Sequence, residues 1–234
     1  MTHVPTIDLY TTPHCPHADA ALTLLRTVTQ QVVPAATVQH HVVADPQAPE
    51  AALLLGSPTI RIDGGDLEGL DAADQPLSCR AYDGAPLPPA WRIEAALLRA
   101  MAPKGWLFLC VANSARSQIA EGLARAMAPA GVTVWSAGSA PTRVRPEAVA
   151  VLEEIGIDIS SHQSKAVGDI PASQVDLVIT LCGEEECPLF LGQATRIHWG
   201  LDDPASVQGS DPARLDAFRR TRDALRTRFA AWLG

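Results

Sequence analysis

The stretch FLCVANSARSQIAEG, residues 108–122, decides the fold of the larger part of this chain. An apolar run reaches Cys110, and a run of helix formers begins at Ser117. A strand that leads directly into a helix is the repeating unit of parallel α/β sheets. The turn between them has Cys110 at its start and Arg116 at its end. This arrangement predicts an α/β fold with reactive side chains in the turn.

The turn itself predicts a site for an oxyanion. Backbone N–H groups and the positive end of the helix dipole converge at such a turn, and an arginine can bind two oxygens of a tetrahedral anion. The same field stabilises a thiolate, so we expect Cys110 to be a nucleophile. The expected oxyanion-binding residues are Asn113, Ser114, Ala115, Arg116 and Ser117. The alternative is that Cys110 only fills the buried end of a strand.

Strands and helices continue to alternate after this stretch. Strands are expected at 106–110, 132–136, 175–181 and 196–200. Helices are expected at 117–128, at 146–155 and from Asp211 onward, where apolar residues recur at helical spacing. The alternation predicts a parallel sheet covered on both faces.

A boundary between two domains is expected near residue 103. The turn-rich stretch DGAPLPPA (83–90) precedes a helix at 91–102, and Pro103 and Gly105 end it. The predicted domains are 1–102 and 105–234. The first contains strands at 6–10 and 37–43, a helix at 16–30 with Ala20, Leu24, Leu25 and Val28 on one side, and a hairpin that turns at Asp63-Gly64 after PTIRI (58–62).

Composition excludes several classes of protein. The 234 residues are 47% hydrophobic and carry a net charge of −8, which argues against a disordered chain and against a nucleic-acid partner. No apolar run approaches the roughly 18 residues that span a bilayer, and the first residues lack the pattern of a signal peptide. The sequence therefore predicts a soluble cytoplasmic protein with no membrane partner.

Two further cysteines, Cys182 and Cys187, follow the strand expected at 175–181. No second Cys or His cluster with metal-ligand spacing lies nearby, which disfavours a metal site. The intervening Gly183 lets the segment loop back toward the Cα separation of about 5.5 Å that a disulfide needs. A redox pair is the favoured interpretation, and two unrelated thiols are the alternative.

Residues 105–234 resemble the low-molecular-weight tyrosine phosphatases, and more closely the thioredoxin-coupled arsenate reductases built on that fold. The matching segments are 108–122, WSAG (135–138), IDISSHQSK (157–165), DLVITLCGEEECP (176–188) and HWGLDDPA (198–205). Gln118, where the phosphatases usually have proline, and the pair Cys182 and Cys187 favour the reductases. The resemblance implies reduction of arsenate to arsenite by a relay through Cys110, Cys182 and Cys187. It implies no cofactor, and thioredoxin or a small thiol as electron donor.

The resemblance also assigns supporting roles. Asp203, in an Asp-Pro pair, matches the family's proton donor, although Asp-Pro is also a common turn. Asn113 would hold the shape of the loop, and His162 and His198 are expected to pack and form hydrogen bonds rather than catalyse.

Some relatives bind potassium beside this loop with an asparagine, a glutamate, a serine and an aspartate. Asn113, Glu121 and Ser136 match three of these ligands, but Lys165 stands at the fourth position. Its ammonium would take the place of the ion, so no potassium dependence is expected.

Residues 1–102 resemble the thioredoxin fold more loosely. Cys15 lies between an expected strand and helix, and Pro58 lies in a stretch similar to that fold's cis-proline loop, while Ala18 replaces the second cysteine of a C-x-x-C motif. Cys15 is thus a candidate redox thiol, although an inert domain or a metal bound with His14 and His17 are alternatives. Cys79 is either its resolving thiol or a free buried cysteine.

Together these features predict an arsenate reductase with its N-terminal domain as built-in reductant. One alternative is a phosphatase that uses only Cys110, Arg116 and Asp203. Another is a non-enzymatic arsenic- or mercury-binding protein, which the intact anion loop argues against.

Overall fold

The computed structural model describes residues 3–45, 47–71, 78–183 and 188–234. Contacts divide the chain into two compact units, Met1–Ala102 and Pro103–Gly234, called here the first and the second unit. Each is described by itself. Within the described ranges, no helix is long and apolar enough to cross a membrane.

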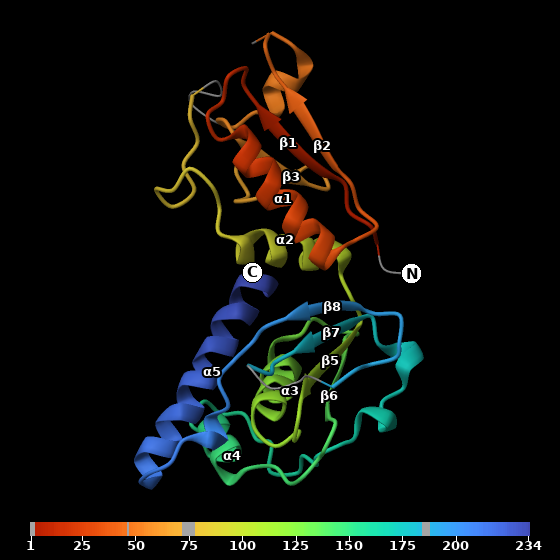
Figure 1. The fold of residues 1–234 in the computed structure, drawn as a ribbon, viewed down its shortest axis with the longest axis vertical. Coiled ribbons are helices and arrows are strands. Elements are labelled where there is room, and N and C mark those ends of the chain that lie inside the picture. Colours follow the sequence, from red (N-terminus) through yellow and green to blue (C-terminus); the bar gives the residue numbers. More distant parts are fainter. Residues whose placement is uncertain (1–2, 46, 72–77, 184–187) are drawn as a thin grey trace. The chain divides into compact units, whose positions relative to one another are not determined.

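The first unit is built on a mixed four-stranded sheet (Figure 1). The strands β1 (Ile7–Thr11), β2 (Val38–Val42), β3 (Thr59–Ile62) and β4 (Gly65–Asp66) lie in the order β2-β1-β3-β4. β1 is parallel to β2 and antiparallel to β3, and β3 and β4 form the hairpin expected at Asp63-Gly64. The helices are α1 (Ala18–Val32) and α2 (Ala90–Met101), with a 3-10 turn η1 (Pro49–Leu53).

The predicted buried side of α1 is off by one position. Leu25 and Val28 are buried as expected, but Ala21 is buried in place of Ala20, which is exposed, and Leu24 is only half-buried. The helix begins at Ala18 rather than at residue 16, because Pro16 and His17 belong to the preceding turn.

The second unit contains a fully parallel sheet, which confirms the predicted α/β fold class. The strands β5 (Gly105–Cys110), β6 (Thr133–Gly138), β7 (Leu177–Thr180) and β8 (Thr195–His198) lie in the order β6-β5-β7-β8. All six residues of β5 are buried, as in a central strand covered on both faces. The carboxyl ends of the four strands therefore meet at one edge.

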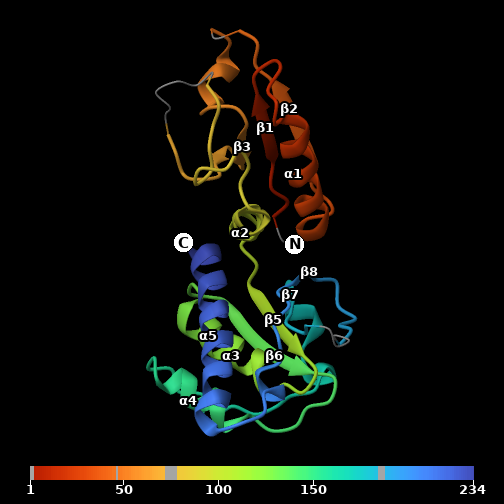
Figure 2. The ribbon, with the colours of Figure 1, turned by 60° about the vertical axis from the view of Figure 1, so that its left-hand side comes forward.

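Helices cover one face of this sheet (Figure 2). α3 (Arg116–Met127) and α5 (Asp211–Leu233) lie against the strands, and α4 (Pro146–Glu153) packs on both helices. Aromatic side chains form the contact: Trp106 of β5 stacks on Trp232, and Phe108 meets the edge of Phe229.

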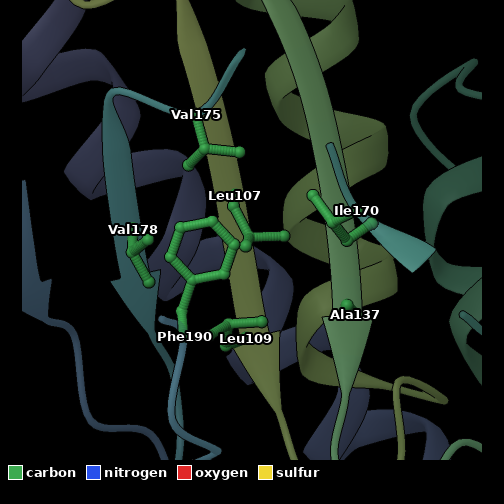
Figure 3. Packing of buried hydrophobic residues seen from close by; sticks show 7 residues of the cluster. All are labelled: Leu107, Leu109, Ala137, Ile170, Val175, Val178 and Phe190. Carbon is green, nitrogen blue, oxygen red and sulfur yellow. The ribbon is translucent and has the colours of Figure 1, made fainter. Parts of the chain in front are cut away.

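The other face is covered without a long helix. Leu107, Leu109 and Val178 of the sheet pack against Ile170 and Phe190 (Figure 3). Ile170 lies between the 3-10 turns η2 (Val167–Asp169) and η3 (Ala172–Gln174). Both faces are thus covered, but the second by short turns and a loop rather than by the alternating helices that the sequence suggested. A further 3-10 turn, η4 (Pro204–Ser206), precedes α5.

Candidate active site

A cavity of about 320 Å³ opens where β5 ends and α3 begins. Its lining consists of the loop between these elements and one residue from outside it: Cys110, Val111, Ala112, Ser114, Ala115, Arg116 and Asp203. The cavity therefore lies at the carboxyl edge of a parallel sheet, where α/β folds bind their ligands.

The loop turns its carbonyl groups away from this cavity. The carbonyls of Val111, Ala112 and Ser114 accept hydrogen bonds from the backbone N–H groups of Ala140 (3.0 Å), Thr142 (3.1 Å) and Arg145 (2.9 Å) respectively. The Asn113 carbonyl between them accepts from Gln118 and Ser164, so all four carbonyls are engaged by other parts of the chain. The loop N–H groups and the N-terminus of α3 are therefore the backbone groups available to an oxyanion in the cavity.

Cys110 is buried at the base of the cavity, with its Sγ 2.9 Å from the Ser117 hydroxyl. The Asn113 side-chain amide donates to that same hydroxyl oxygen at 2.8 Å. Because Ser117 accepts from Asn113, its own proton is available to donate to the sulfur. The Ser117 hydroxyl can thus donate a hydrogen bond to Cys110 Sγ.

Asn113 holds the loop in shape, as the sequence suggested. Its backbone is in the left-handed region at φ +45°, and its side chain is fully buried. The amide nitrogen also donates to Ser136 Oγ (2.8 Å), while its oxygen accepts from the backbone N–H of Lys165 (2.7 Å) and from Gln118 Nε2 (3.0 Å). All four hydrogen-bonding positions of the amide are therefore used, which fixes one loop conformation.

A buried carboxylate lies behind the loop. Glu121 accepts from Ser136 Oγ at 2.5 Å and forms ion pairs with Lys165 at 3.0 Å and Arg125 at 2.7 Å. The Lys165 ammonium thus lies beside Glu121, the carboxylate that matches one of the expected potassium ligands.

Arg116 and Asp203 face each other across the mouth of the cavity. The Arg116 side chain is 4% exposed and donates to the Leu201 carbonyl at 3.0 Å, which directs the guanidinium along the cavity wall. An Asp203 carboxylate oxygen lies 3.7 Å from the guanidinium and also accepts from the backbone N–H of Ala205 at 3.2 Å. Asp203 therefore both caps η4 and lines the cavity, so its place in the turn leaves its carboxylate facing the cavity.

Cys182 is completely buried and lies two residues after the end of β7. Its neighbour Leu181 donates a backbone hydrogen bond to Leu109, next to Cys110, at 2.8 Å. The parallel register thus places Cys110 and Cys182 at the same edge of two adjacent strands. Cys187 lies outside the described residues.

A side-chain contact that the sequence analysis did not identify braces the same loop. The Gln118 amide nitrogen donates to the Asn113 carbonyl and to the Gln163 carbonyl, and its oxygen lies 2.9 Å from His162 Nδ1. Burial lowers the pKa of His162, the Arg125 and Lys165 charges lower it further, and the Glu121 charge opposes them. His162 was expected to pack and to form hydrogen bonds, but its partner Gln118 lies 44 positions away and could not be named from the local sequence.

The family model of the low molecular weight phosphotyrosine protein phosphatases matches residues 106–234, more than half of the chain. The chain belongs to this family. The predicted resemblance is therefore confirmed for the second unit of this phosphatase-family chain.

Characterised relatives of this phosphatase-family chain include arsenate reductases. That of Halalkalibacterium halodurans is 42% identical over 120 residues, which cover 50% of this chain and 86% of the relative. That of Bacillus subtilis is 41% identical over 123 residues, which cover 52% of this chain and 88% of the relative. A solved arsenate reductase in its reduced state is 34% identical, with a TM-score of 0.47 and coverage of 56% of this chain and 96% of that one.

Residues 1–105 lie outside the phosphatase-family match. Here Cys15 is half-buried in the turn before α1, and Pro58 follows Ser57 through a cis peptide bond. Cys79 is opposite Ser57 in an isolated bridge and is exposed, so it is not the buried thiol of the alternative interpretation. Among the described residues, no three His, Cys, Asp or Glu side chains are grouped to hold a metal ion.

Proposed function

We propose that the second unit reduces arsenate to arsenite. The observation that carries this proposal is the placement of Cys182, a second buried cysteine, two residues beyond the end of β7, the strand that pairs with β5 and its terminal Cys110. A phosphate-ester hydrolase needs one nucleophile, whereas a two-electron reduction needs a second thiol. Arsenate reductases are among the relatives of this chain, which supports the reductase over the hydrolase.

The first step is attack by the Cys110 thiolate on arsenic. Arg116 and the inward-facing N–H groups bind the arsenate oxygens, and a bond forms between Cys110 Sγ and arsenic. One arsenic–oxygen bond breaks, and Asp203 supplies the proton with which that oxygen leaves as water.

The second step transfers the electrons. The Cys182 thiolate attacks Cys110 Sγ, the sulfur–arsenic bond breaks, and its electron pair stays on arsenic, which departs as arsenite. The two sulfurs are now a disulfide. Cys187 attacks Cys182, which forms a Cys182–Cys187 disulfide and returns Cys110 to its thiolate.

The oxidised pair must then receive two electrons from a thiol donor. Thioredoxin or a small thiol fits this role, and we infer that Cys15 of the first unit is a built-in donor. Such a disulfide is reduced by thiol–disulfide exchange with a thiolate that can reach it.

Two assays on the same enzyme test the reaction. Arsenate-dependent thiol oxidation is measured beside hydrolysis of p-nitrophenyl phosphate, for the parent chain and for Cys110→Ser and Cys182→Ser. We expect Cys110→Ser to lose both activities. Cys182→Ser should lose arsenate turnover and keep any phosphatase activity, because the nucleophile, the anion loop and Asp203 remain.

The competing function is hydrolysis of phosphate esters. The loop, Arg116 and Asp203 suffice for it, since a tetrahedral phosphate has the same shape and charge as arsenate. Equal loss of both activities in Cys182→Ser, or phosphatase turnover with no arsenate-dependent oxidation in the parent, would favour the hydrolase.

A further inference from the structure

Three segments of the first unit meet at the carboxyl end of β1, and Ser57 connects them. The Ser57 hydroxyl oxygen accepts from the backbone N–H of Thr12 at 3.0 Å. Its backbone N–H donates to the Ser78 carbonyl at 2.8 Å, and its carbonyl accepts from the backbone N–H of Arg80 at 3.1 Å. Cys79 is therefore held directly opposite Ser57 in a parallel bridge.

The direction of the side chains follows from this bridge. Paired residues of neighbouring strands project to the same side of a sheet. Ser57 and Cys79 therefore share a side, and the Ser57 hydroxyl contacts Thr12, at the start of the loop that follows β1. That loop ends at Cys15, whose backbone N–H closes a turn onto the Thr12 carbonyl at 3.3 Å.

A buried ion pair fixes the segment that carries Cys79. The Arg80 guanidinium donates to both carboxylate oxygens of Asp66, at 2.6 and 2.8 Å, and lies over the Tyr82 ring. The Tyr82 hydroxyl in turn donates to the Pro58 carbonyl at 2.9 Å. These contacts hold the backbone that follows Cys79 against the 56–58 loop.

The close approach also depends on a glycine. A Cβ added at Gly56 would lie 2.9 Å from Arg80 Cβ, closer than side chains tolerate, and Gly56 has φ +98°. The sequence around both cysteines thus favours one close arrangement of the 56–58 and 78–80 segments.

We propose that Cys15 and Cys79 form a redox pair, a second thiol site that is separate from the relay of the second unit. Cys15 is half-buried and Cys79 is exposed, so a disulfide substrate can reach both. Ala18 removes the usual second cysteine from the helix start, and Cys79 supplies the missing thiol from a neighbouring segment.

The reaction balances with a disulfide as the oxidant. The Cys15 thiolate attacks one sulfur of the substrate disulfide, so a mixed disulfide forms and one thiolate leaves. The Cys79 thiolate then attacks Cys15 Sγ and releases the second thiolate, each leaving thiolate taking up one proton. Two thiols of the first unit lose two electrons, and the substrate disulfide becomes two thiols.

The test uses the full chain carrying Cys110→Ser, Cys182→Ser and Cys187→Ser, so that only Cys15 and Cys79 remain. Oxidised glutathione is the probe, followed by rapid alkylation and peptide mass mapping. We expect a Cys15–Cys79 linked peptide and little glutathione adduct, because a tethered thiol has an effective concentration on the order of millimolar. Adding Cys79→Ser should make the Cys15–glutathione adduct accumulate to near one per chain.

A second pair of variants tests the placement. Gly56→Ala should slow conversion of the adduct to the linked peptide by about tenfold or more, whereas Gly64→Ala, at φ +76° with no atom within 4 Å of the added Cβ, should not. An adduct that persists equally with and without Cys79, or a linkage that forms only between chains at high protein concentration, would overturn the pair. Since no cysteine of the second unit is present, neither result depends on arsenate reduction.

Discussion

The Lys165 ammonium nitrogen lies 3.0 Å from a carboxylate oxygen of Glu121, which is 1% exposed. Because Glu121 also accepts from Ser136, and Ser136 accepts from Asn113, the charge of Lys165 stabilises the base of the anion loop. A buried carboxylate without a cation would be costly. We therefore expect the ion pair to take the place of a bound cation at this position.

The first prediction is that potassium has no effect on this protein. Exchange of potassium for sodium at constant ionic strength should leave kcat/KM for arsenate unchanged within about twofold, since the ammonium already neutralises Glu121. A several-fold loss of activity in sodium would show that Lys165 does not replace the ion.

Lys165→Asp provides the matched control. This change restores an oxygen ligand beside Asn113, Glu121 and Ser136, so the variant should be destabilised in sodium and recover in potassium. The measurement is the melting temperature in each salt.

The second prediction concerns pH and His162. Burial lowers the pKa of His162, so the unfolded chain takes up a proton at higher pH than the folded protein does. The stabilising contribution is complete above the ordinary histidine pKa of about 6.5 and is lost as the pH falls toward the lower folded value.

His162→Gln separates this contribution from others. Glutamine can still donate to the Gln118 oxygen but does not titrate, so the variant should melt below the parent at pH 8 by a gap that narrows below pH 6.5. Thermal unfolding of both proteins across this range is the measurement. If the difference in melting temperature between the two proteins stays constant with pH, His162 is not the source of the pH-dependent loss of stability.

Much of this site was accessible from the sequence, because a strand, a turn and a helix follow one another in the segment around Cys110. Such local order is encoded in apolar spacing and turn residues. The brace from Gln118 to His162 was not accessible, since it depends on how the 157–165 segment returns to the loop. The turns that cover the second face of the sheet were not predicted either, because turns of three residues are too short to show a periodic apolar pattern.

The position of α1 shows a different failure. Its apolar spacing was recognised, but its start was placed two residues early, and Ala20 rather than Ala21 was assigned to the buried side. One residue corresponds to 100° of rotation in an α-helix, so Ala21 and not Ala20 points to the core. Strand β1 was also predicted one residue too early, at 6–10 rather than Ile7–Thr11. Its pairing to β2 and β3 nevertheless fixes its register in the sheet.

The third prediction concerns Gly138, where β6 approaches the anion loop. A Cβ there would lie 2.3 Å from the Val111 carbonyl oxygen and 2.8 Å from the Asn113 nitrogen. Gly138→Ala should therefore displace the loop and lower kcat/KM by about 10²-fold, as misplaced binding groups do. Gly168→Ala, with no atom within 4 Å of the added Cβ, is the control and should retain activity. Comparable losses in both variants would point to general destabilisation instead.

The fourth prediction concerns proton transfer by Asp203. Asp203→Asn keeps an oxygen for the Ala205 contact but has no acidic proton, so kcat should fall by about 10² to 10⁴-fold with KM for arsenate little changed. Asp202→Asn removes a neighbouring exposed carboxylate and should have almost no effect. If the two variants lose activity equally, the loss comes from the removed negative charge and not from the missing Asp203 proton donor.

The last prediction concerns the electron donor. If Cys15 reduces the oxidised pair of the second unit, exchange must pass through a disulfide between Cys15 and Cys182 or Cys187. Quenching with acid after one round of arsenate, followed by non-reducing peptide mapping, should reveal that linked peptide, and Cys79→Ser should increase its amount. Cys15→Ser should slow turnover with small thiols but not with added thioredoxin, which bypasses the first unit. Dilution of the enzyme distinguishes exchange within one chain, which is independent of concentration, from exchange between chains. A Cys15 that stays free through turnover, with Cys15→Ser as active as the parent in small thiols, would assign the reduction to external donors alone.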